Sequence, residues 1–335
     1  MIQIIRQSNS EVTDYYLDVI AQMCSDGADI YDRSHKLEDC SKTDVVIVPT
    51  ANDFLRAYKL GYRKIIYWMQ GLDGEESYLK HHSILRKKVL DFLTWFALKN
   101  ACVIFYVSEE MRRYVERKFR MQTTEKSFVM PCFNVTKENG SSFSEEKYRK
   151  NIFSYVGSLS KWQCFPETVE LYKKIEQKYK DTEFRVFTFS VKEAEEICKA
   201  KGIEHYSIET VAPEHMTEAL KDVKFGFVLR ENIAVNNVAT PTKLSSYLSA
   251  GVIPVFSIYL SDFYERTKLC EYVIPVADSE ISEKLDSLIT GAVDAKQLSH
   301  EYDELFSTYY NPAYYKDAYC HKLHDTLNFN YESSI

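Results

Sequence analysis

The chain has 335 residues, of which 45% are hydrophobic and 27% charged, and its net charge is −7. This composition is typical of a folded globular protein, and the length allows two domains of ordinary size. The negative charge argues against a general nucleic-acid binder. No run approaches the ~18 apolar residues of a membrane span. The opening MIQIIRQSNSEV lacks the apolar core of a signal peptide, so we expect a cytoplasmic protein.

The cysteines and the charges are distributed in different ways. The eight cysteines are scattered and form no CxxC pair, which argues against zinc sites and redox motifs. The charge is uneven: residues 80–120 contain ten Lys or Arg against four Asp or Glu, a local +6. The rest of a chain of −7 therefore carries −13, which predicts one basic face on an acidic body.

The first half alternates apolar strands with helices. We expect strands at Ile2–Arg6, Val45–Val48, Lys64–Met69, Cys102–Val107 and Ser127–Met130, and helices at Thr13–Met23, Asn52–Leu60, Tyr78–Leu98 and Glu109–Phe119. Continuous apolar strands separated by helices indicate a parallel sheet covered on both faces. The polar segment 136–150, with Asn-Gly-Ser-Ser near its start, then predicts a linker.

After this segment the alternation restarts. We expect strands at Ile152–Val156, Phe184–Phe189, His205–Ile208, Phe225–Arg230, Val252–Phe256 and Cys270–Val276, and helices at Pro166–Tyr179, Val191–Ala200, Pro213–Lys221, Pro241–Ala250, Ile281–Ile289 and along the tail 297–329. The pattern predicts an α/β protein with two doubly wound halves. Ligands of such sheets bind at the carboxyl ends of the strands, so we expect a site in a cleft between the halves.

The stretch from Phe225 to Phe256 is a strand, a polar loop, a short helix and a second strand. Pro241 suits the first turn of that helix, with Thr240 as its N-cap. The N–H groups of the helix start and the charge of Lys243 would then favour a phosphate. The alternative is a plain capped loop with Lys243 in solvent. The candidate ligand-binding residues of this loop are Arg230, Glu231, Asn236, Asn237, Thr240, Pro241 and Lys243.

A second loop, YVGSLSKWQCFPETVEL, follows the strand that ends near Val156. Gly157 allows close approach of a ligand to the backbone, and Ser158 and Lys161 precede the next helix. Lys161 would contact a phosphate or a leaving diphosphate; the alternative is a solvated lysine. The GxxxxGK[ST] pattern of a P-loop is absent. Glu231 would accept hydrogen bonds from ribose or sugar hydroxyls, or else pair with Arg230.

These two loops resemble the carboxy-terminal half of GT-B glycosyltransferases, closest to the large family 4 group. The group often shows P-x-K-x-x-E-Y-L-A-x-G, and Pro241, Lys243, Tyr247, Leu248 and Gly251 match it in register. The first half matches more loosely, through FYVSEEMRRYV and SFVMPCFN. Ser246 stands where the family has a glutamate that commonly holds the ribose.

The resemblance implies the GT-B fold, with two Rossmann-like domains that face a central cleft. The acceptor domain would comprise residues 1–135 and the nucleotide-sugar domain residues 151–300, on either side of the linker 136–150. Helices at 301–335 would cross back to the first domain. It also implies metal-independent transfer with no cofactor, from a co-substrate of the UDP- or GDP-sugar type. Lys161, Arg230 and Lys243 would stabilise the leaving diphosphate.

Polar residues also follow the expected strand at Lys64–Met69, in the sequence MQGLDGEESYL. We expect Gln70, Glu75 and Glu76 on the acceptor side, and Asp73 as general base if the enzyme inverts. The alternative is that these carboxylates only cap a helix start.

The segment that begins at Lys80 mixes basic residues with Leu, Phe and Trp, and such a helix can lie on an anionic membrane. The alternative is a core helix with a solvated charged face. The resemblance favours the membrane, because many such enzymes use lipid-linked acceptors. Residues 80–120 would then bind the inner face of the plasma membrane peripherally.

The sequence therefore predicts a glycosyltransferase that moves a sugar to a hydroxyl of a glycan or lipid-linked acceptor, in bacterial surface polysaccharide synthesis. Two alternatives stay open. One is a nucleotide-sugar epimerase on the same fold. The other is a non-catalytic scaffold, which Ser246 would allow.

Overall fold

The computed structural model describes residues 2–5, 11–25, 31–32, 45–134, 141–277 and 280–332. Internal contacts divide the chain into two units, residues 1–132 with 311–335 (unit 1) and residues 133–310 (unit 2). The expected boundary at residue 300 is wrong in detail, because it falls inside helix α14 (Ala295–Ser307), which belongs to unit 2.

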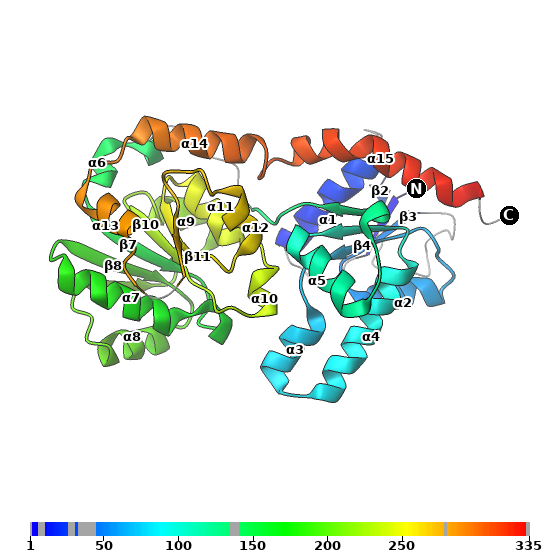
Figure 1. The fold of residues 1–335 in the computed structure, drawn as a ribbon, viewed down its shortest axis with the longest axis horizontal. Helices are drawn as coiled ribbons and strands as arrows, with labels where there is room; N and C mark the ends of the chain where they lie inside the picture. Colours follow the sequence, from blue (N-terminus) through cyan, green and yellow to red (C-terminus); the bar gives the residue numbers. More distant parts are fainter. Residues whose placement is uncertain are drawn as a thin grey trace. The chain divides into compact units, whose positions relative to one another are not determined.

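Unit 1 is a parallel six-stranded sheet with helices on both faces (Figure 1). Its elements are β1 (Ile2–Ile4), α1 (Glu11–Cys24), β2 (Tyr31–Asp32), β3 (Val45–Val48), α2 (Ala51–Lys59), β4 (Ile65–Met69), α3 (Asp73–His81), α4 (Ile84–Asn100), β5 (Val103–Tyr106), α5 (Glu109–Phe119), β6 (Ser127–Val129) and α15 (Pro312–Glu332). The strand order is β2-β1-β3-β4-β5-β6. Strands β4 and β5 are buried along their whole length, as continuous apolar runs predict.

The single helix expected at Tyr78–Leu98 is two helices, and the break has a local cause. His82 ends α3 in the left-handed conformation, with φ of 52°. Ser83 then caps α4, because its hydroxyl accepts a hydrogen bond from the N–H of Arg86 at 3.3 Å. The two helices form a hairpin that projects from unit 1 (Figure 1).

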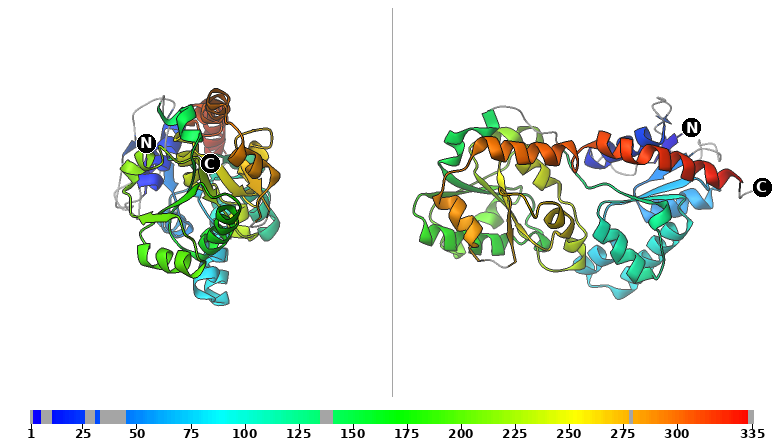
Figure 2. Two further views of the ribbon diagram at one scale, coloured as in Figure 1. Left: turned by 90° about the vertical axis from the view of Figure 1, so that its left-hand side faces the viewer. Right: turned by 45° about the horizontal axis from the view of Figure 1, so that its top comes forward.

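The last helix, α15, packs in unit 1 beside α1 (Figure 2). Tyr319 donates a hydrogen bond to the carbonyl of Val129 at 2.9 Å, and its ring lies 5.0 Å from that of Phe128. The C-terminal segment therefore completes the covering of the first sheet, at the end of β6.

Unit 2 is a second parallel six-stranded sheet, and its strand order is β12-β11-β10-β7-β8-β9. Its elements are α6 (Glu145–Tyr148), β7 (Asn151–Val156), the 3-10 turn η4 (Lys161–Gln163), α7 (Phe165–Lys178), β8 (Thr182–Phe187), α8 (Val191–Ala200), β9 (Tyr206–Glu209), α9 (Met216–Ala219), β10 (Phe225–Val228), α10 (Ala234–Asn237), α11 (Thr242–Ser249), β11 (Ile253–Ser257), α12 (Ser261–Arg266), β12 (Ile274–Val276), α13 (Glu283–Thr290) and α14. Counted within the unit, this is the 3-2-1-4-5-6 order of dinucleotide-binding sheets. The strand order reverses between β7 and β10, and ligands bind such sheets at that point.

The segment 141–150 is not the plain linker that its polarity predicts; residues 136–140 lie outside the described part. Lys147 is buried, and its ammonium donates to the carbonyls of Ala250 and Ser142. The Tyr148 hydroxyl donates to the carbonyl of Gly251 at 2.8 Å. A cation at a helix C-terminus satisfies carbonyls that have no partner in the helix. These contacts fix the end of α11.

A close contact between Gly226 and Tyr247 places helix α11 against the sheet. Gly226 in β10 has no side chain, and a Cβ there would stand 2.6 Å from the ring of Tyr247. Tyr247 is fully buried against the strand. The glycine and the tyrosine together set the height of α11 above the sheet, and hence the position of its first turn.

Candidate functional site

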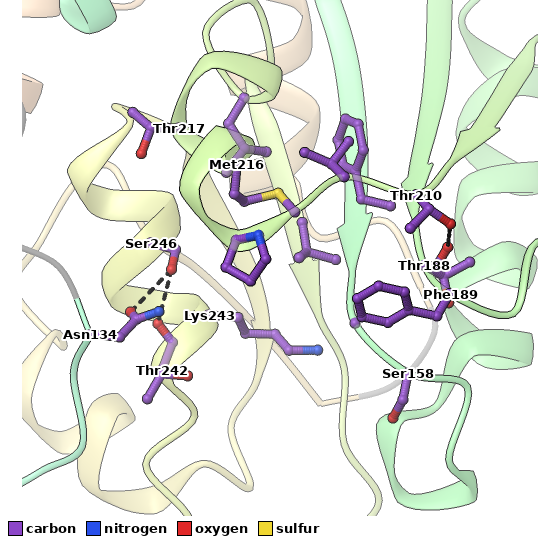
Figure 3. Close-up of a pocket in the computed structure, with 16 residues that line it drawn as sticks. Asn134, Ser158, Thr188, Phe189, Thr210, Met216, Thr217, Thr242, Lys243 and Ser246 are labelled. Carbon is purple, nitrogen blue, oxygen red and sulfur yellow. Dashed lines mark hydrogen bonds between the residues drawn. The ribbon is translucent and has the colours of Figure 1, made fainter. Parts of the chain in front are cut away.

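A cavity of about 360 Å³ opens at the carboxyl end of the second sheet, beside β7 (Figure 3). Its walls come from the loops after β7, β8 and β9, from α9, and from the first turns of α11. The sixteen lining residues are Asn134, Val156, Gly157, Ser158, Phe187, Thr188, Phe189, Thr210, Val211, Pro213, Met216, Thr217, Leu220, Thr242, Lys243 and Ser246. The cavity therefore lies where the strand order reverses, as expected for a sheet of this topology.

Lys243 is the one charged residue among those that line the cavity. It lies in the first turn of α11 and extends across the cavity toward Ser158 and Phe189 (Figure 3). Its ammonium donates to Oε1 of Gln163 at 2.5 Å and lies 5.0 Å from the centre of the Tyr155 ring. Although the residue keeps some exposure, its charged end points inward.

Arg230 reaches the same amide oxygen from the end of β10. Its guanidinium donates to Oε1 of Gln163 at 3.3 Å and to the carbonyl of Leu229 at 2.8 Å. The backbone N–H of Arg230 is held by the Ser257 hydroxyl at 2.8 Å. Two cations from two different elements thus converge on one neutral acceptor.

Gln163 connects these cations to the loop after β7. Its amide N–H donates to the Ser158 hydroxyl at 3.1 Å. Gly157 has φ of +135°, and a Cβ there would stand 2.9 Å from Nζ of Lys243. Only glycine leaves room for the lysine and for this backbone conformation. Gly157, Ser158, Arg230 and Lys243, candidates from two separate loops, thus come together around Gln163, which was not a candidate.

The cluster has no anionic partner among the cavity's lining residues. Burial lowers the pKa of Lys243 well below its ordinary value, and the nearby Arg230 lowers it further. Burial also lowers the pKa of Arg230, while Tyr155 acts in the opposite direction. Removing cations from water without a countercharge costs free energy. An anion bound beside Lys243 would recover that free energy.

The wall nearest the start of α11 is built from short polar groups. Oδ1 of Asn134 accepts hydrogen bonds from the hydroxyls of Ser245 at 2.9 Å and Ser246 at 3.1 Å. Figure 3 shows the contact with Ser246. Asn134 was not among the candidates either. An amide beside two hydroxyls can both donate to and accept from a ligand's hydroxyl groups.

The opposite wall is mostly apolar. The hydroxyl of Thr210 donates to the carbonyl of Thr188 at 2.8 Å, which joins the ends of β9 and β8. Phe189 follows directly and is 80% exposed at the mouth of the cavity. Such a wall, with few polar groups, suits a flat ring better than a charged group.

The expected cap of α11 is wrong. Pro241, not Thr240, is the N-cap, and no side chain caps the helix. Thr240 is buried instead. Pro241 has a φ of −65°, which suits a helix, but its ψ of 125° is extended, so the helix starts one residue later than the sequence pattern predicts.

The remaining candidates of the loop after β10 make internal contacts. Asn236 is buried and donates to the carbonyl of Glu231 at 3.0 Å, while Asn237 donates to Oδ1 of Asn232 at 3.0 Å. Neither these two residues nor Glu231 lines the cavity. Lys161 is exposed in the turn η4, also outside the lining. The two asparagines therefore shape the loop that carries Arg230.

In unit 1 the acidic loop after β4 contains two kinds of carboxylate. Asp73 begins α3 and keeps contact with solvent, yet burial of its carboxylate, helped by Glu76, raises its pKa to about 6. Glu75 accepts hydrogen bonds from Lys118 and Tyr114, each at 2.7 Å, and from Lys87. Although burial raises the pKa of Glu75, these donors lower it to about 2.

Glu76 and Gln70 have local partners. Oε1 of Glu76 accepts from the N–H of Leu72 at 3.2 Å, which caps the start of α3. Oε1 of Gln70 accepts from the Thr13 hydroxyl at 3.5 Å. The pKa of Asp73, raised to about 6, suits a general base.

Within the described ranges, no group of three or more His, Cys, Asp or Glu side chains is arranged to hold a metal ion. No helix in the same ranges has the length and apolarity that crossing a bilayer requires.

No protein-family model and no curated protein sequence matches the chain. Solved structures do match. HepE from Anabaena, solved with UDP and glucose, has a TM-score of 0.68 at 12% identity, over 96% of this chain and 98% of that one. TarM from S. aureus, a mutant solved with fondaparinux, α-GlcNAc-glycerol and UDP, has a TM-score of 0.61 at 12% identity. A UDP-forming α,α-trehalose-phosphate synthase from Burkholderia xenovorans has a TM-score of 0.58 at 10% identity.

The chain has the GT-B fold. The match to the synthase covers 96% of this chain and 80% of the enzyme. The match to TarM covers 86% of this chain and 56% of TarM, so the chain spans little more than half of that protein's length. Identities of 10–12% establish the fold, and the chemistry has to be argued from the site.

Gln163 and Asn134 are polar residues of the site that were not among the sequence candidates. Gln163 lies in the loop after β7, two residues after Lys161. Because Lys161 is charged, the sequence pattern favours it over the neutral glutamine as a phosphate-binding residue. Asn134 ends the segment SFVMPCFN, within the expected acceptor domain 1–135. In both cases an amide gains its role from partners about 70 to 110 residues away, which no local pattern reveals.

Proposed function

We propose that this protein is a glycosyltransferase, which moves a sugar from a nucleoside-diphosphate sugar to a hydroxyl group of an acceptor. The observation that carries the proposal is the pair formed by Lys243 and Arg230, two inward-facing cations that share one neutral amide oxygen. A diphosphate is the group in a sugar donor that such a pair would neutralise.

In the proposed reaction the leaving diphosphate gains negative charge as the bond to the sugar breaks. Lys243 and Arg230 would release Oε1 of Gln163 and bind phosphate oxygens instead. The cations are already in place and shielded from water, so their field acts without reorganisation of solvent. Lys161, exposed in η4, would add charge from the outer side of the same loop.

The rest of the donor would follow the two walls of the cavity. Ser246 and Asn134 offer hydroxyl and amide groups for sugar or ribose hydroxyls, at the position where the related family has a glutamate. The apolar wall that contains Phe189 suits the base. We propose a UDP-type donor, because HepE and TarM were solved with UDP and the synthase is UDP-forming. Glu231 and the asparagine pair of α10 would act by shaping the loop.

The acceptor would be a glycan or a lipid-linked glycan, bound by unit 1. Asp73 would accept the proton of the attacking hydroxyl if the reaction inverts the anomeric centre, since its pKa of about 6 suits a base near neutral pH. Bacterial surface polysaccharide synthesis remains the proposed context, with no metal ion or cofactor assigned.

Two measurements test the proposal in sequence. Calorimetry with UDP, GDP and their sugars should show binding, and exchange of Gln163 for Leu should change it, because the amide positions both cations. A protein that binds none of these ligands contradicts the proposal. Incubation of a bound UDP-sugar with glycan acceptors should then give a glycosylated product.

The same incubation without acceptor separates the alternatives. An altered sugar nucleotide in the absence of acceptor identifies an epimerase. Binding with neither product identifies a nucleotide-binding protein that lacks transfer, which the serine at position 246 would allow. Asp73→Asn should lower transfer about 10²-fold or more while leaving UDP affinity unchanged, if Asp73 is the base.

A further inference from the structure

The helical hairpin of unit 1 carries an apolar surface that nothing in the described structure covers. Five of the ten large hydrophobic side chains that are exposed in the described residues lie on it. One is Tyr78 on α3. The other four are on α4: Ile84 (60% exposed), Leu85 (76%), Val89 (52%) and Phe92 (60%). Single exposed apolar residues are normal, whereas a contiguous group indicates a binding surface.

The four α4 residues lie on one side of the helix. At about 100° per residue they fall within an arc of about 140°. The opposite side packs on unit 1: Lys87 pairs with Glu75 of α3, and Asp91 pairs with Lys118 of α5. The exposed stripe is therefore not the face that holds the hairpin together.

The charges around the stripe have one sign. The fourteen residues from Ser77 to Leu90 contain no Asp or Glu but include Lys80, Arg86, Lys87 and Lys88. Arg86 is exposed beside the stripe, and the exposed Lys88 lies within its arc, between Ile84 and Phe92. Farther along the basic segment the cations of α5 are neutralised, since Arg112 pairs with Glu109 and Arg117 with Glu110. In the hairpin, no carboxylate of the described residues pairs with Arg86 or Lys88.

We infer that the α3–α4 hairpin docks on an anionic lipid bilayer, with Leu85, Val89 and Phe92 in the acyl boundary and Arg86 and Lys88 at the headgroups. Apolar side chains flanked by cations are the combination that binds such an interface. A second copy of the chain fits less well, because symmetric docking of the stripe would bring the cations of both copies together. The inference does not depend on sugar transfer.

Sedimentation with vesicles tests the inference. The full chain should bind vesicles of phosphatidylcholine with about one third phosphatidylglycerol at low salt, and bind pure phosphatidylcholine vesicles far less. Leu85→Ser with Phe92→Ser should weaken binding at least tenfold, as expected for loss of two buried apolar side chains. Arg86→Glu with Lys88→Glu should weaken it by about fivefold or more for each charge.

Matched variants in unit 2 give the controls. Leu269→Ser removes a fully exposed apolar residue, and Lys180→Glu with Lys192→Glu removes two exposed cations. These should bind vesicles like the parent, and all variants should keep the parent's Tm and its affinity for UDP. If the parent ignores the anionic vesicles, or binds them equally well without the stripe, the inference is overturned. It is also overturned if the stripe variants abolish a dimer and leave vesicle binding intact. A parent that docks but does not bind UDP would contradict only the proposed function.

Discussion

The two units treat buried charge in opposite ways. In unit 1, Glu75 accepts hydrogen bonds from two lysines and a tyrosine, so its charge is matched inside the fold. In unit 2, Lys243 and Arg230 share one amide oxygen, and no carboxylate lines the cavity beside them. A matched charge serves stability, whereas an unmatched one is a cost that a ligand can remove. The pairing state of a charge thus separates a structural group from a binding group.

Removing the unmatched charge should have the largest effect. Lys243→Met should lower sugar transfer by about 10²- to 10³-fold, because a preorganised cation at the leaving group is lost. The Tm should stay the same or rise, since a buried cation without a countercharge is no longer present. Steady-state kinetics and thermal melting check both. Lys192→Met, an exposed lysine of unit 2, is the control, and a fall in Tm for Lys243→Met would refute the distinction.

A carboxylate beside Lys243 and Arg230 should pair their charges, as the charge of Glu75 is paired in unit 1. Gln163→Glu would place an anion between the two cations, so the Tm should rise by about 2–4 °C. UDP affinity should fall at least about tenfold, because the new carboxylate repels the diphosphate. Calorimetry and melting measure these effects, and Gln177→Glu on the exposed side of α7 is the matched control. Tighter UDP binding would show that the cations do not meet the diphosphate.

Removing the charge of Glu75, which is matched by its donors in unit 1, should lower stability and leave the unit 2 site unchanged. Glu75→Gln should destabilise the protein by about 1–2 kcal/mol after allowance for solvent screening, with UDP affinity unchanged. The folded pKa is about 2, below the ordinary 4.5. The contribution of Glu75 is therefore present above about pH 4.5 and is lost as the pH falls toward 2. Urea unfolding at neutral pH and near pH 3 measures the difference in stability between the parent and Glu75→Gln, which should be smaller near pH 3. Glu125→Gln, at an exposed glutamate, is the control.

The smallest effect is a proton taken up on binding. The free pKa of Lys243 is lowered, and a diphosphate beside it would raise that pKa again. UDP binding should therefore absorb part of a proton, and the affinity should weaken as the pH rises through the free pKa of Lys243. Calorimetry in buffers of different ionisation enthalpy measures the uptake. It should vanish in Lys243→Met, and uptake that persists there would assign it to another group.

The sequence predicted the fold well where periodicity is long and continuous. The helices at Glu109–Phe119 and Val191–Ala200 have the expected bounds. The prediction of helix bounds was wrong where the backbone conformation of one residue ends a helix. His82 has a left-handed backbone, and it splits one expected helix into two. Short elements such as α10 and α12 were not expected, because four to six residues give too few periods to recognise.

The site was predicted in part, for a similar reason. Gly157, Arg230 and Lys243 were recognisable because strand ends and helix starts have fixed places in a parallel sheet. The role of Gln163 depends on two cations from β10 and α11, and that of Asn134 on two serines of α11. Amide partners are set by packing across the unit, which a single sequence does not encode locally.

The anchoring of α11 by Lys147 and Tyr148 has a practical consequence for dissecting the molecule. Burial lowers the pKa of Lys147 to about 7, which shows that burying its charge costs free energy. The packing of the complete unit has to offset that cost. A fragment of unit 2 that starts at β7 would leave the carbonyls of Ala250 and Gly251 without these donors. Anyone who expresses unit 2 alone should begin upstream of Ser142, because the polar stretch before β7 is part of that unit's architecture.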